Sequence, residues 1–367
     1  MISKQFIYNY MKLEDNRFYL LDFYRAIAAL AVVLFHYNLF YILGNNSKEP
    51  SQKEPPLYDI FFFGYDNGWL AVQFFFVLSG FIFFNLYLKK INNREINFKN
   101  FFILRFSRLY PLHILTLLLA LFISSLFVES YFLDNIDLKH FFLNIFLIQN
   151  WGFEDGNSFN QPAWSISVEI LMYGIFFFVA KTKKFLLPII LILIILSSIV
   201  FFKYKLIGYG GFCFFIGGLT NKIFELIKKI NFKNSWIIFY LFLLLILLIF
   251  YSLHNYNFSS KEQKVLLIVF FFPSLILASV VFPMRNNLII KKISIIGNFS
   301  YSIYLFHYLI LLIFIYFLKK FDIFINFNSL YFFSAYLLTC FFVSIISFYF
   351  FEIPLQNLIR KKLILRK

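Results

Sequence analysis

Ten apolar segments, each about 20 residues long, restrict the folds open to this chain more than any other feature. About 20 consecutive apolar residues are what a helix needs to cross the hydrocarbon core of a bilayer. The predicted spans cover residues 20–43, 68–88, 109–128, 164–180, 185–202, 206–224, 235–253, 265–284, 297–318 and 329–351. So many segments of this kind cannot all be core helices of a soluble domain. The sequence therefore predicts an all-α membrane protein with about ten transmembrane helices.

The composition also excludes a soluble protein of this size. Hydrophobic residues make up 61% of the 367-residue chain and charged residues only 14%, whereas soluble domains average about 45–50% apolar and 25% charged. The two cysteines, Cys213 and Cys340, both lie in apolar runs. They therefore indicate neither a disulfide framework nor a metal site, and we expect no metal.

The net charge of +16 is explained by membrane topology. If the N-terminus is inside, Lys and Arg gather in segments 89–108, 181–184, 222–234 and 285–292 and in both terminal segments, while most acidic residues fall in the outer loops. This distribution follows the positive-inside rule. We therefore expect both termini in the cytoplasm, and nucleic-acid binding is not needed to explain the charge.

We expect one transmembrane domain over residues 1–367. It would consist of a cytoplasmic N-terminal segment (1–19), a ten-helix core (20–351) and a basic cytoplasmic tail (352–367). The first twenty residues lack the apolar core of a signal peptide, so the first span itself would direct insertion. A shorter apolar stretch, 139–150, is too brief to cross and is expected to lie at the surface or to re-enter.

The first span carries three ionisable residues, Asp22, Arg25 and His36. Eleven residues separate Arg25 from His36, which is close to three helical turns, so both side chains share one face of the helix. Arg25 would lie near one membrane surface and His36 about 16 Å deeper. Ionisable groups inside a bilayer are costly and mark functional sites, so this stripe is a candidate site.

The second and third spans carry small and basic residues. Ser79 and Gly80 would let a neighbouring helix approach closely, as packed membrane helices require. Arg105 and Arg108 are spaced i,i+3 just before the third predicted span, and Pro111 would occupy the first turn of that helix. The arginine pair is either an ordinary positive-inside anchor or a phosphate clamp, since arginine binds phosphate oxygens bidentately.

A polar stripe runs along the fourth span. Ser165, Glu169 and Tyr173 recur at i,i+4 spacing, and Trp164 precedes them at interface depth. Glu169 would lie about 7 Å below the outer surface, where a carboxylate is either neutral or paired. The depths of His36 and Glu169 allow a pair between them, although the sequence does not show that their helices are neighbours.

The ninth and tenth spans add a further polar group. Ser300, Tyr304 and His307 fall at i, i+4 and i+7 on one helix face, and His307 reaches a depth like that of the first-span histidine. Glu352 and Pro354 stand at the inner end of the last span, before a basic tail.

Together these groups resemble the bacterial membrane acyltransferase family called acyltransferase 3. The matching motifs are LDFYRAIAALAVVLFH, FFVLSGF, the arginine pair before Tyr110 and Pro111, PAWSISVEILMY, and GNFSYSIYLFH, and they extend from Leu21 to Pro354. Departures from the family pattern are mild: Tyr24, Gln73 and Ile353 replace a leucine, an aspartate and a basic residue that are common there.

The resemblance implies a ten-helix enzyme of the bacterial cytoplasmic membrane. Such proteins move an acyl group, usually acetyl, from a cytoplasmic coenzyme A thioester to a hydroxyl on a cell-surface polysaccharide, a lipid-linked glycan or a related acceptor. The expected partners are acyl-CoA, the glycan acceptor and membrane lipids, with a homo-oligomer left open. The chain resembles the short form of the family, without a fused esterase-like domain.

The resemblance also assigns roles to residues. His36 would act as general base or be acylated transiently, with Glu169 fixing its tautomer and Arg25 completing the catalytic set. The donor-site candidates are Arg25, Arg105, Arg108 and Ser79, and the acceptor-site candidates are Trp164, Ser165, Tyr173, Tyr304 and His307. The longest outer loop, residues 129–163, is where we expect an acceptor-binding surface.

Two other functions are kept as alternatives. A polytopic transporter or flippase would use Arg25, His36 and Glu169 as an ion or proton relay, although no internal repeat is visible to support it. A structural or accessory subunit would keep the fold without activity, and the presence of all three ionisable residues argues against this. Transfer of label from acetyl-CoA would separate the enzyme from both.

Overall fold

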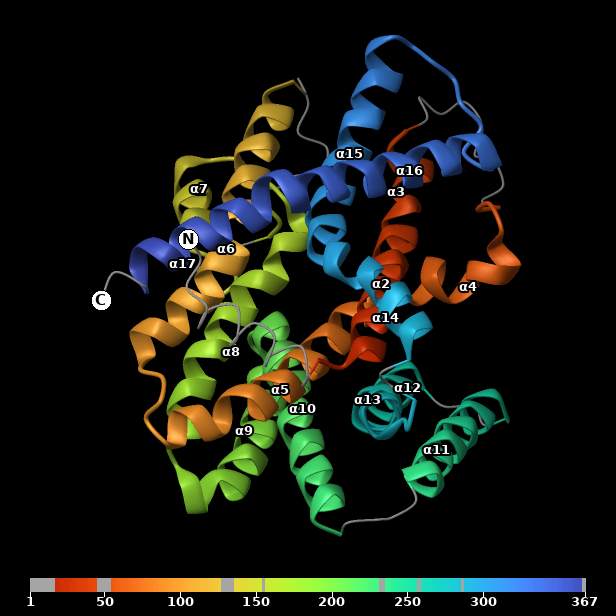
Figure 1. The fold of residues 1–367 in the computed structure, drawn as a ribbon. Helices are drawn as coiled ribbons and strands as arrows, with labels where there is room; N and C mark the ends of the chain where they lie inside the picture. Colours follow the sequence, from red (N-terminus) through yellow and green to blue (C-terminus); the bar gives the residue numbers. More distant parts are fainter. Residues whose placement is uncertain are drawn as a thin grey trace. The chain divides into compact units, whose positions relative to one another are not determined.

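The structure is a computed structural model that describes residues 17–44, 54–126, 135–153, 156–230, 235–255, 259–284 and 287–364. These parts of the chain are almost entirely helical and contain no strand. Apolar chain in a bilayer must satisfy its backbone hydrogen bonds internally, and an α-helix does so within one segment. The fold class predicted from the sequence is confirmed (Figure 1).

The helices follow one another from α2 to α17. Their bounds are α2 Tyr19–Tyr37, α3 Leu39–Leu43, α4 Tyr58–Asn67, α5 Leu70–Asn92, α6 Phe98–Leu126, α7 Leu138–Ile145, η1 Gln161–Ala163, α8 Trp164–Ala180, η2 Lys183–Phe185, α9 Leu186–Val200, α10 Lys205–Ile230, α11 Ser235–Asn255, α12 Ser260–Leu266, η3 Leu267–Phe271, α13 Phe272–Val281, α14 Leu288–Ser294, η4 Ile295–Phe299, α15 Ser300–Lys320, α16 Leu330–Ser347, η5 Phe348–Glu352 and α17 Ile353–Leu363. Within the described ranges, ten helical stretches are long and apolar enough to cross a membrane. The predicted number of spans is confirmed, and the orientation of the termini stays a prediction.

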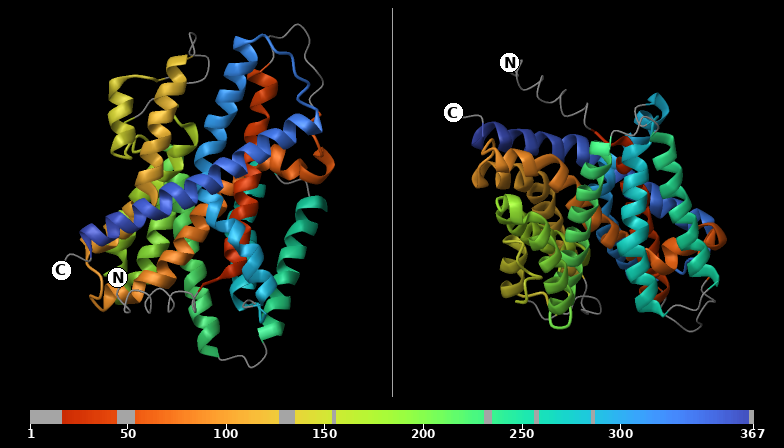
Figure 2. Two further views of the ribbon diagram at one scale, coloured as in Figure 1. Left: turned by 45° about the horizontal axis from the view of Figure 1, so that its top comes forward. Right: turned by 90° about the horizontal axis from the view of Figure 1, so that it is seen from below.

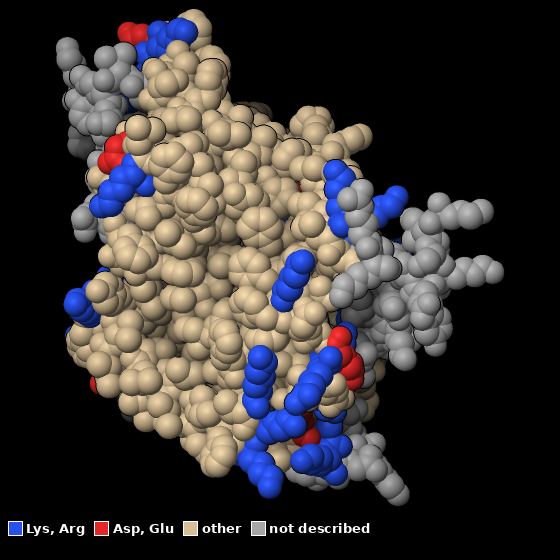
Figure 3. All heavy atoms as spheres, turned by 90° about the vertical axis from the view of Figure 1, so that its left-hand side faces the viewer, with Lys and Arg blue, Asp and Glu red and all other residues tan. Residues whose placement is uncertain are grey.

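The exposed surface of the helices is largely apolar. Helices α9 and α11 expose most of their Leu and Ile side chains, which in water would be a large unfavourable area. On the face shown in Figure 3, charged side chains are few and broad areas between them are uncharged. This surface suits a lipid environment, and the chain is a polytopic membrane protein.

The third span begins earlier than the sequence predicted. Helix α6 starts at Phe98 rather than near residue 109, so the expectation that Pro111 occupies a first turn is wrong. The helix continues through its basic residues because Phe101 and Leu109 are buried on one face, while the guanidinium of Arg105 lies over aromatic rings. The arginine pair therefore sits inside a 29-residue helix.

The last span also extends beyond its predicted end. A π-helical turn, η5, carries Glu352, and α17 then continues to Leu363 where a tail had been expected. Helix α17 packs on α6 (Figure 2), and Arg360 Nε donates to Ser107 Oγ at 3.1 Å. Basic residues in the last turn of α17 suit the negative end of the helix dipole.

The chain divides into two compact units. The smaller unit comprises residues 1–26 and 224–298, in which α11 packs against α13. The larger unit comprises residues 27–223 and 299–367, in which α5 packs on α8 and α15 packs on α6 and α16. The prediction that both belong to one domain stays a prediction.

Close packing of α5 against α10 organises the larger unit. A Cβ added at Gly80 would lie 1.9 Å from the carbonyl oxygen of Phe214, and one at Gly217 would lie 2.0 Å from that of Val77. Both positions therefore need glycine, as helix contacts in membranes often do. The close approach predicted for the Ser79–Gly80 pair is confirmed at Gly80.

Candidate functional site

A pair of histidines lies in the centre of the larger unit. His36 comes from α2 and His307 from α15, and Nδ1 of His36 lies 3.2 Å from Nε2 of His307. The ring centroids are 4.9 Å apart. His307 is fully buried and His36 partly buried. Two helices that are far apart in the sequence thus bring together the two histidines that the sequence predicted at similar depth.

The hydrogen bonds around the pair assign a tautomer to each ring. His307 Nδ1 lies 3.1 Å from the carbonyl oxygen of Ile303, so it carries the proton, and its Nε2 is then an acceptor. His36 Nδ1 lies 2.9 Å from the carbonyl oxygen of Val32 and faces the His307 acceptor, so it is also protonated. In the neutral ring the lone pair of His36 is therefore on Nε2. Such a nitrogen is able to accept a proton from a hydroxyl.

Tyr304 joins this pair to the start of α8. Its hydroxyl donates to the carbonyl oxygen of Pro162 at 2.8 Å and lies 2.8 Å from Ser165 Oγ. Its ring centroid is 6.1 Å from that of His307. The structure thus brings together three of the residues that the sequence proposed for the acceptor: Ser165, Tyr304 and His307.

A second polar cluster surrounds Glu169 between α5 and α8. Ser79 Oγ donates to Glu169 Oε1 at 2.5 Å, and the Tyr173 hydroxyl donates to the same oxygen. Glu169 and Tyr173 therefore lie on the same face of α8, as their spacing predicted. Ser79 supplies a partner from another helix, which the sequence did not predict.

Arg105 lies beside this cluster and is separated from Glu169 by aromatic side chains. Its guanidinium bonds to the Tyr87 hydroxyl and lies 4.9 Å from the ring centroid of Phe83. Phe83 in turn stacks on Tyr173 with centroids 4.1 Å apart. Arg108, one turn further along α6, is exposed. The two arginines of the predicted clamp therefore have different surroundings, one in an aromatic cage and one accessible.

The structure does not pair His36 with Glu169, the arrangement that the helix depths had left open. His36 instead contacts Val32 and His307, while Glu169 contacts Ser79 and Tyr173. The helix periodicity placed each side chain on the correct face of its own helix. The partners depend on which helices are neighbours, and sequence spacing holds no information about that.

A further carboxylate lies at the end of the last span. Ser302 of α15 donates to Glu352, a residue for which the sequence analysis proposed no partner. The neighbouring Tyr301 hydroxyl donates to the carbonyl oxygen of Leu109 at 2.7 Å, two residues before Pro111 in α6. These contacts fix α15 against α6 and the last span.

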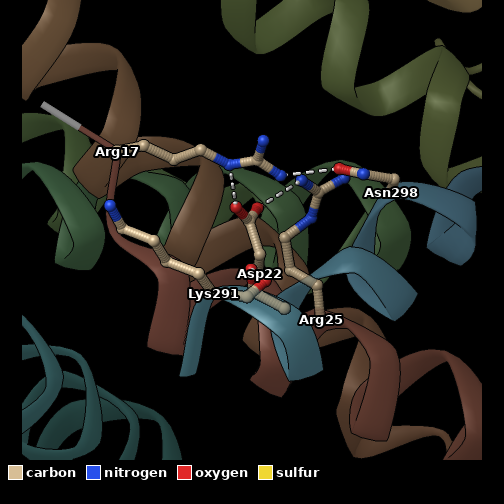
Figure 4. A network of polar contacts seen from close by, with 6 residues as sticks. Arg17, Asp22, Arg25, Lys291 and Asn298 are labelled. Atoms are coloured by element: carbon tan, nitrogen blue, oxygen red, sulfur yellow. Dashed lines mark hydrogen bonds and ion pairs between the residues drawn. The ribbon is translucent and has the colours of Figure 1, made fainter. Parts of the chain in front are cut away.

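The smaller unit contains a cationic cluster at the start of α2. Figure 4 shows the Asp22 carboxylate between the guanidinium groups of Arg17 and Arg25, with Lys291 beside them. Arg17 Nε donates to Asp22 at 2.6 Å, and Arg25 Nη1 lies 3.3 Å from it. Arg17 also donates to Asn298 Oδ1 at 2.6 Å. Two guanidinium groups share one carboxylate, and guanidinium groups also bind phosphate oxygens, so the cluster is a candidate site for an anion such as a phosphate.

Close backbone packing forms this cluster. A Cβ at Gly297 would lie 2.0 Å from the carbonyl oxygen of Asp22, so only glycine allows η4 to approach the first turn of α2. The sequence identified Arg25 but treated Arg17 and Lys291 only as topology signals. Their role is visible only once residues 224–298 are packed against the start of α2.

Residues of the loop before α8 line a small cavity in the larger unit, with room for about one water molecule; most of them were not singled out from the sequence. Its walls are mainly amide side chains, together with the indole of Trp164: Asn144, Gln149, Asn150, Asn157, Asn160 and Gln161. From the sequence we expected an acceptor-binding surface somewhere in the loop 129–163. Within that loop, the run of Asn and Gln residues was the feature that could have located the cavity. Asparagine is common throughout this chain, so the run did not stand out.

The short helix α7 provides part of this wall. It is the apolar stretch that was predicted to lie at the surface or to re-enter, and Asp137 caps its N-terminus. The backbone N–H of His140 donates to Asp137 Oδ1 at 2.8 Å, and this bond is the main reason that the pKa of Asp137 is below its ordinary value. Asn144 then donates to Ser158 Oγ at 2.9 Å and ties the helix to the loop.

Metal binding finds no support in the part of the chain that the structure describes. No group of three or more His, Cys, Asp or Glu side chains there is arranged to hold an ion. Cys213 and Cys340 are buried and unpaired with each other. The expectation of no metal stays a prediction for the protein as a whole.

Comparison with known proteins identifies the family. The family model of the acyltransferase domain, acyltransferase 3, matches residues 18–349. A protein of Staphylococcus aureus (strain COL) named "Putative O-acetyltransferase" is 26% identical over 230 residues, which are 60% of this chain and 31% of that protein. An uncharacterized protein of Haemophilus influenzae is 27% identical over 227 residues, 59% of this chain and 89% of its own length.

A shorter match has higher identity. "Protein 2 in picA locus" of Rhizobium radiobacter is 36% identical over 104 residues, 28% of this chain and 44% of that protein. The chain spans about a third of the length of the staphylococcal relatives. No solved structure matches it significantly. The resemblance drawn from the motifs is confirmed by the family match over nearly the whole sequence, and the chain belongs to the acyltransferase 3 family of membrane proteins.

Proposed function

We propose that this protein is a membrane O-acyltransferase of the bacterial cytoplasmic membrane. It transfers an acyl group, in our proposal acetyl, from cytoplasmic acyl-CoA to a hydroxyl of a cell-surface polysaccharide, a lipid-linked glycan or a related acceptor. The family match and the name of the staphylococcal relatives support acyl transfer. The observation that carries the proposal is the tautomer of His36, whose hydrogen bonds within the described chain all involve Nδ1.

His36 is the general base in this proposal. Its Nε2 lone pair takes the proton of the acceptor hydroxyl as the oxygen attacks the thioester carbonyl. The carbon–sulfur bond then breaks, and the thiolate of coenzyme A leaves and recovers the proton from Nε2. His307 is a positioning residue, because its Nε2 and the carbonyl oxygen of Val32 share the His36 Nδ1–H as acceptors and so keep the lone pair on the other nitrogen.

The donor is a polyanion, and basic residues would hold its phosphates. Arg25 pairs with the Asp22 carboxylate that Arg17 also binds, and a phosphate would add charge-assisted hydrogen bonds to these guanidinium groups. The exposed Arg108 is a second candidate. The caged Arg105 is better suited to fixing α6 against the aromatic side chains of α5.

Glu169 acts through Ser79 and Tyr173 in this proposal. It accepts hydrogen bonds from both side chains and so holds α5 and α8 in register. This is a positioning role, and it replaces the direct contact with His36 on which the sequence-based mechanism relied.

The decisive test is transfer of radiolabel from acetyl-CoA to surface glycan in membranes that contain the protein. General-base assistance is typically worth about 10²–10⁴-fold, so His36→Ala should lower the transfer rate by that factor, or roughly 3–6 kcal/mol in barrier. Ile27→Ala, an exposed position on the same helix, is the matched control and should retain wild-type transfer.

Retained transfer in the His36→Ala protein, at equal expression, would refute the mechanism. A protein that moves no label from acetyl-CoA but carries protons or a glycan lipid across vesicles would instead be the transporter or flippase alternative. In that case the same polar residues would serve as a relay.

A further inference from the structure

The last helical stretch of the larger unit is longer than a bilayer requires. It runs from Leu330 to Leu363 through α16, η5 and α17, which is 34 residues. At about 1.5 Å per residue it is about 51 Å long, whereas the hydrocarbon core is about 30 Å thick. Even at a tilt of about 40°, the upper end of the usual range, it would cover about 39 Å of depth. Since α16 is the apolar part, the basic α17 is the part that lies at the level of the lipid head groups.

One face of α17 is exposed along the whole helix. No residue of α17 is buried, and exposed residues recur at intervals of three and four. This spacing places them in one stripe on the helix surface. Leu358 in the stripe is 46% exposed, and the neighbouring Leu363 is 56% exposed. The exposed stripe, which combines an apolar side chain with two cations, consists of Pro354, Asn357, Leu358, Lys361 and Lys362.

The opposite face of α17 is fixed on α6, which it crosses in the larger unit (Figure 1, Figure 2). Arg360 Nε donates to Ser107 Oγ at 3.1 Å, and Arg360 Nη2 lies 3.4 Å from the carbonyl oxygen of Leu104. Because Arg360 faces α6, the two residues that follow it face away from α6. The two lysines are therefore held in an outward orientation.

The charge of this pair is not neutralised within the described part of the chain. None of the ion pairs between described residues involves Lys361 or Lys362. Segment 353–364 contains no Asp or Glu. Glu352 stands about 14 Å further back along the helix axis, where it accepts a hydrogen bond from Ser302. The exposed end of α17 is therefore a surface that would attract anions.

Anionic phospholipid head groups fit this surface better than a soluble anion does. A soluble anion would bind the lysines and leave the exposed leucines in water. A helix that lies in the membrane interface places its apolar side chains at the boundary of the acyl chains. Its lysines extend at the same time to the phosphates of the head groups. The length of the helical stretch brings α17 to the depth at which both contacts form.

We propose that the exposed face of α17 binds anionic phospholipid head groups. Lys361 and Lys362 contact the phosphates, and Leu358 and Leu363 lie in the uppermost part of the acyl region. This inference does not depend on the proposed function, because it requires no acyl transfer.

Fluorescence quenching by lipids, without acyl-CoA, tests the inference. Asn357→Cys lies in the exposed stripe and is labelled with bimane, while the native Cys213 and Cys340 are buried. The labelled full chain is placed in phosphatidylcholine nanodiscs that contain an equal small fraction of nitroxide-labelled phosphatidylglycerol or nitroxide-labelled phosphatidylcholine. Each lysine near a membrane surface favours anionic lipid about fivefold. We therefore expect phosphatidylglycerol to be preferred about tenfold or more at the label.

Removal of the two charges identifies the residues responsible. With Lys361→Gln and Lys362→Gln together, the preference for phosphatidylglycerol should fall about tenfold. The matched control is Lys183→Gln with Lys184→Gln, which removes the same charge from two adjacent exposed lysines of η2. The control should keep the wild-type preference. Thermal unfolding should be unchanged in both double variants, since none of these lysines takes part in an ion pair between described residues.

Equal quenching by the two nitroxide lipids would overturn the inference, and so would a preference that survives the loss of both lysines of α17. A label that neither lipid quenches would place α17 in water and would overturn it as well. Failure of acyl transfer from acetyl-CoA would refute the proposed function and leave the lipid result unaffected.

Discussion

At the scale of single residues, the chemistry depends on which nitrogen of His36 is free. Val32 and His307 both face Nδ1, so the proton stays there and Nε2 keeps its lone pair. Sequence periodicity found both histidines because each is an ionisable residue in an apolar helix. It could not find the contact, since 271 residues separate the two side chains.

The contribution of His307 can be separated from the packing of its ring. His307→Phe keeps the ring volume at a fully buried position but removes the acceptor, whereas His307→Gln offers an amide oxygen to the His36 Nδ1 proton. The carbonyl oxygen of Val32 still accepts from the same N–H in both variants, so the loss is the net value of one hydrogen bond, about 0.5–1.5 kcal/mol. We expect kcat to fall about tenfold in the Phe variant and to recover to within about threefold of wild type in the Gln variant.

Steady-state acetyl transfer with purified protein measures this, with KM for acetyl-CoA unchanged in both variants. If the Gln variant is as slow as the Phe variant, His307 contributes ring shape rather than an acceptor. The tautomer argument for His36 would then fail.

At the scale of helices, the sequence predicted where most helices lie but not which helices pack against one another. Hydropathy located ten spans because each is apolar over a bilayer's thickness. It placed the start of α6 too late because Arg105 interrupts the apolar window, although the guanidinium is accommodated over Phe83 and Tyr87. The contacts that build the site, such as Ser79 with Glu169, depend on helix packing that no window of the sequence reports.

The contact between α5 and α10 gives a prediction at this scale. Gly80→Ala would place a methyl group against the carbonyl oxygen of Phe214, so the helices must separate. Overpacking of this kind typically costs about 1–3 kcal/mol. Because the neighbouring Ser79 donates to Glu169, acyl transfer should fall as well.

Thermal unfolding in detergent measures the first effect, and Gly174→Ala is the matched control. Gly174 is also helical, but a Cβ there meets nothing within 4 Å, so alanine should leave the melting temperature unchanged or raise it through helix propensity. Equal melting temperatures for Gly80→Ala and the wild type would show that α5 and α10 are not in close contact.

At the scale of the whole molecule, the proposal needs a donor on one side of the membrane and an acceptor on the other. The orientation rests on the distribution of Lys and Arg in the loops and tails. It predicts that segment 89–108 is cytoplasmic and that the loop between α9 and α10 is outside. Arg94 and Lys203 are exposed residues in these two loops.

Cysteine labelling tests this orientation with little background, since Cys213 and Cys340 are both buried. A membrane-impermeant maleimide added to intact cells should label Lys203→Cys and should leave Arg94→Cys unlabelled until the cells are permeabilised. The reverse pattern would place the loop before α10 in the cytoplasm and turn the proposed direction of transfer around. The basic residues would then face away from the cytoplasm, which supplies coenzyme A thioesters. Arg25 and Arg108 could not be ligands of the donor in that orientation.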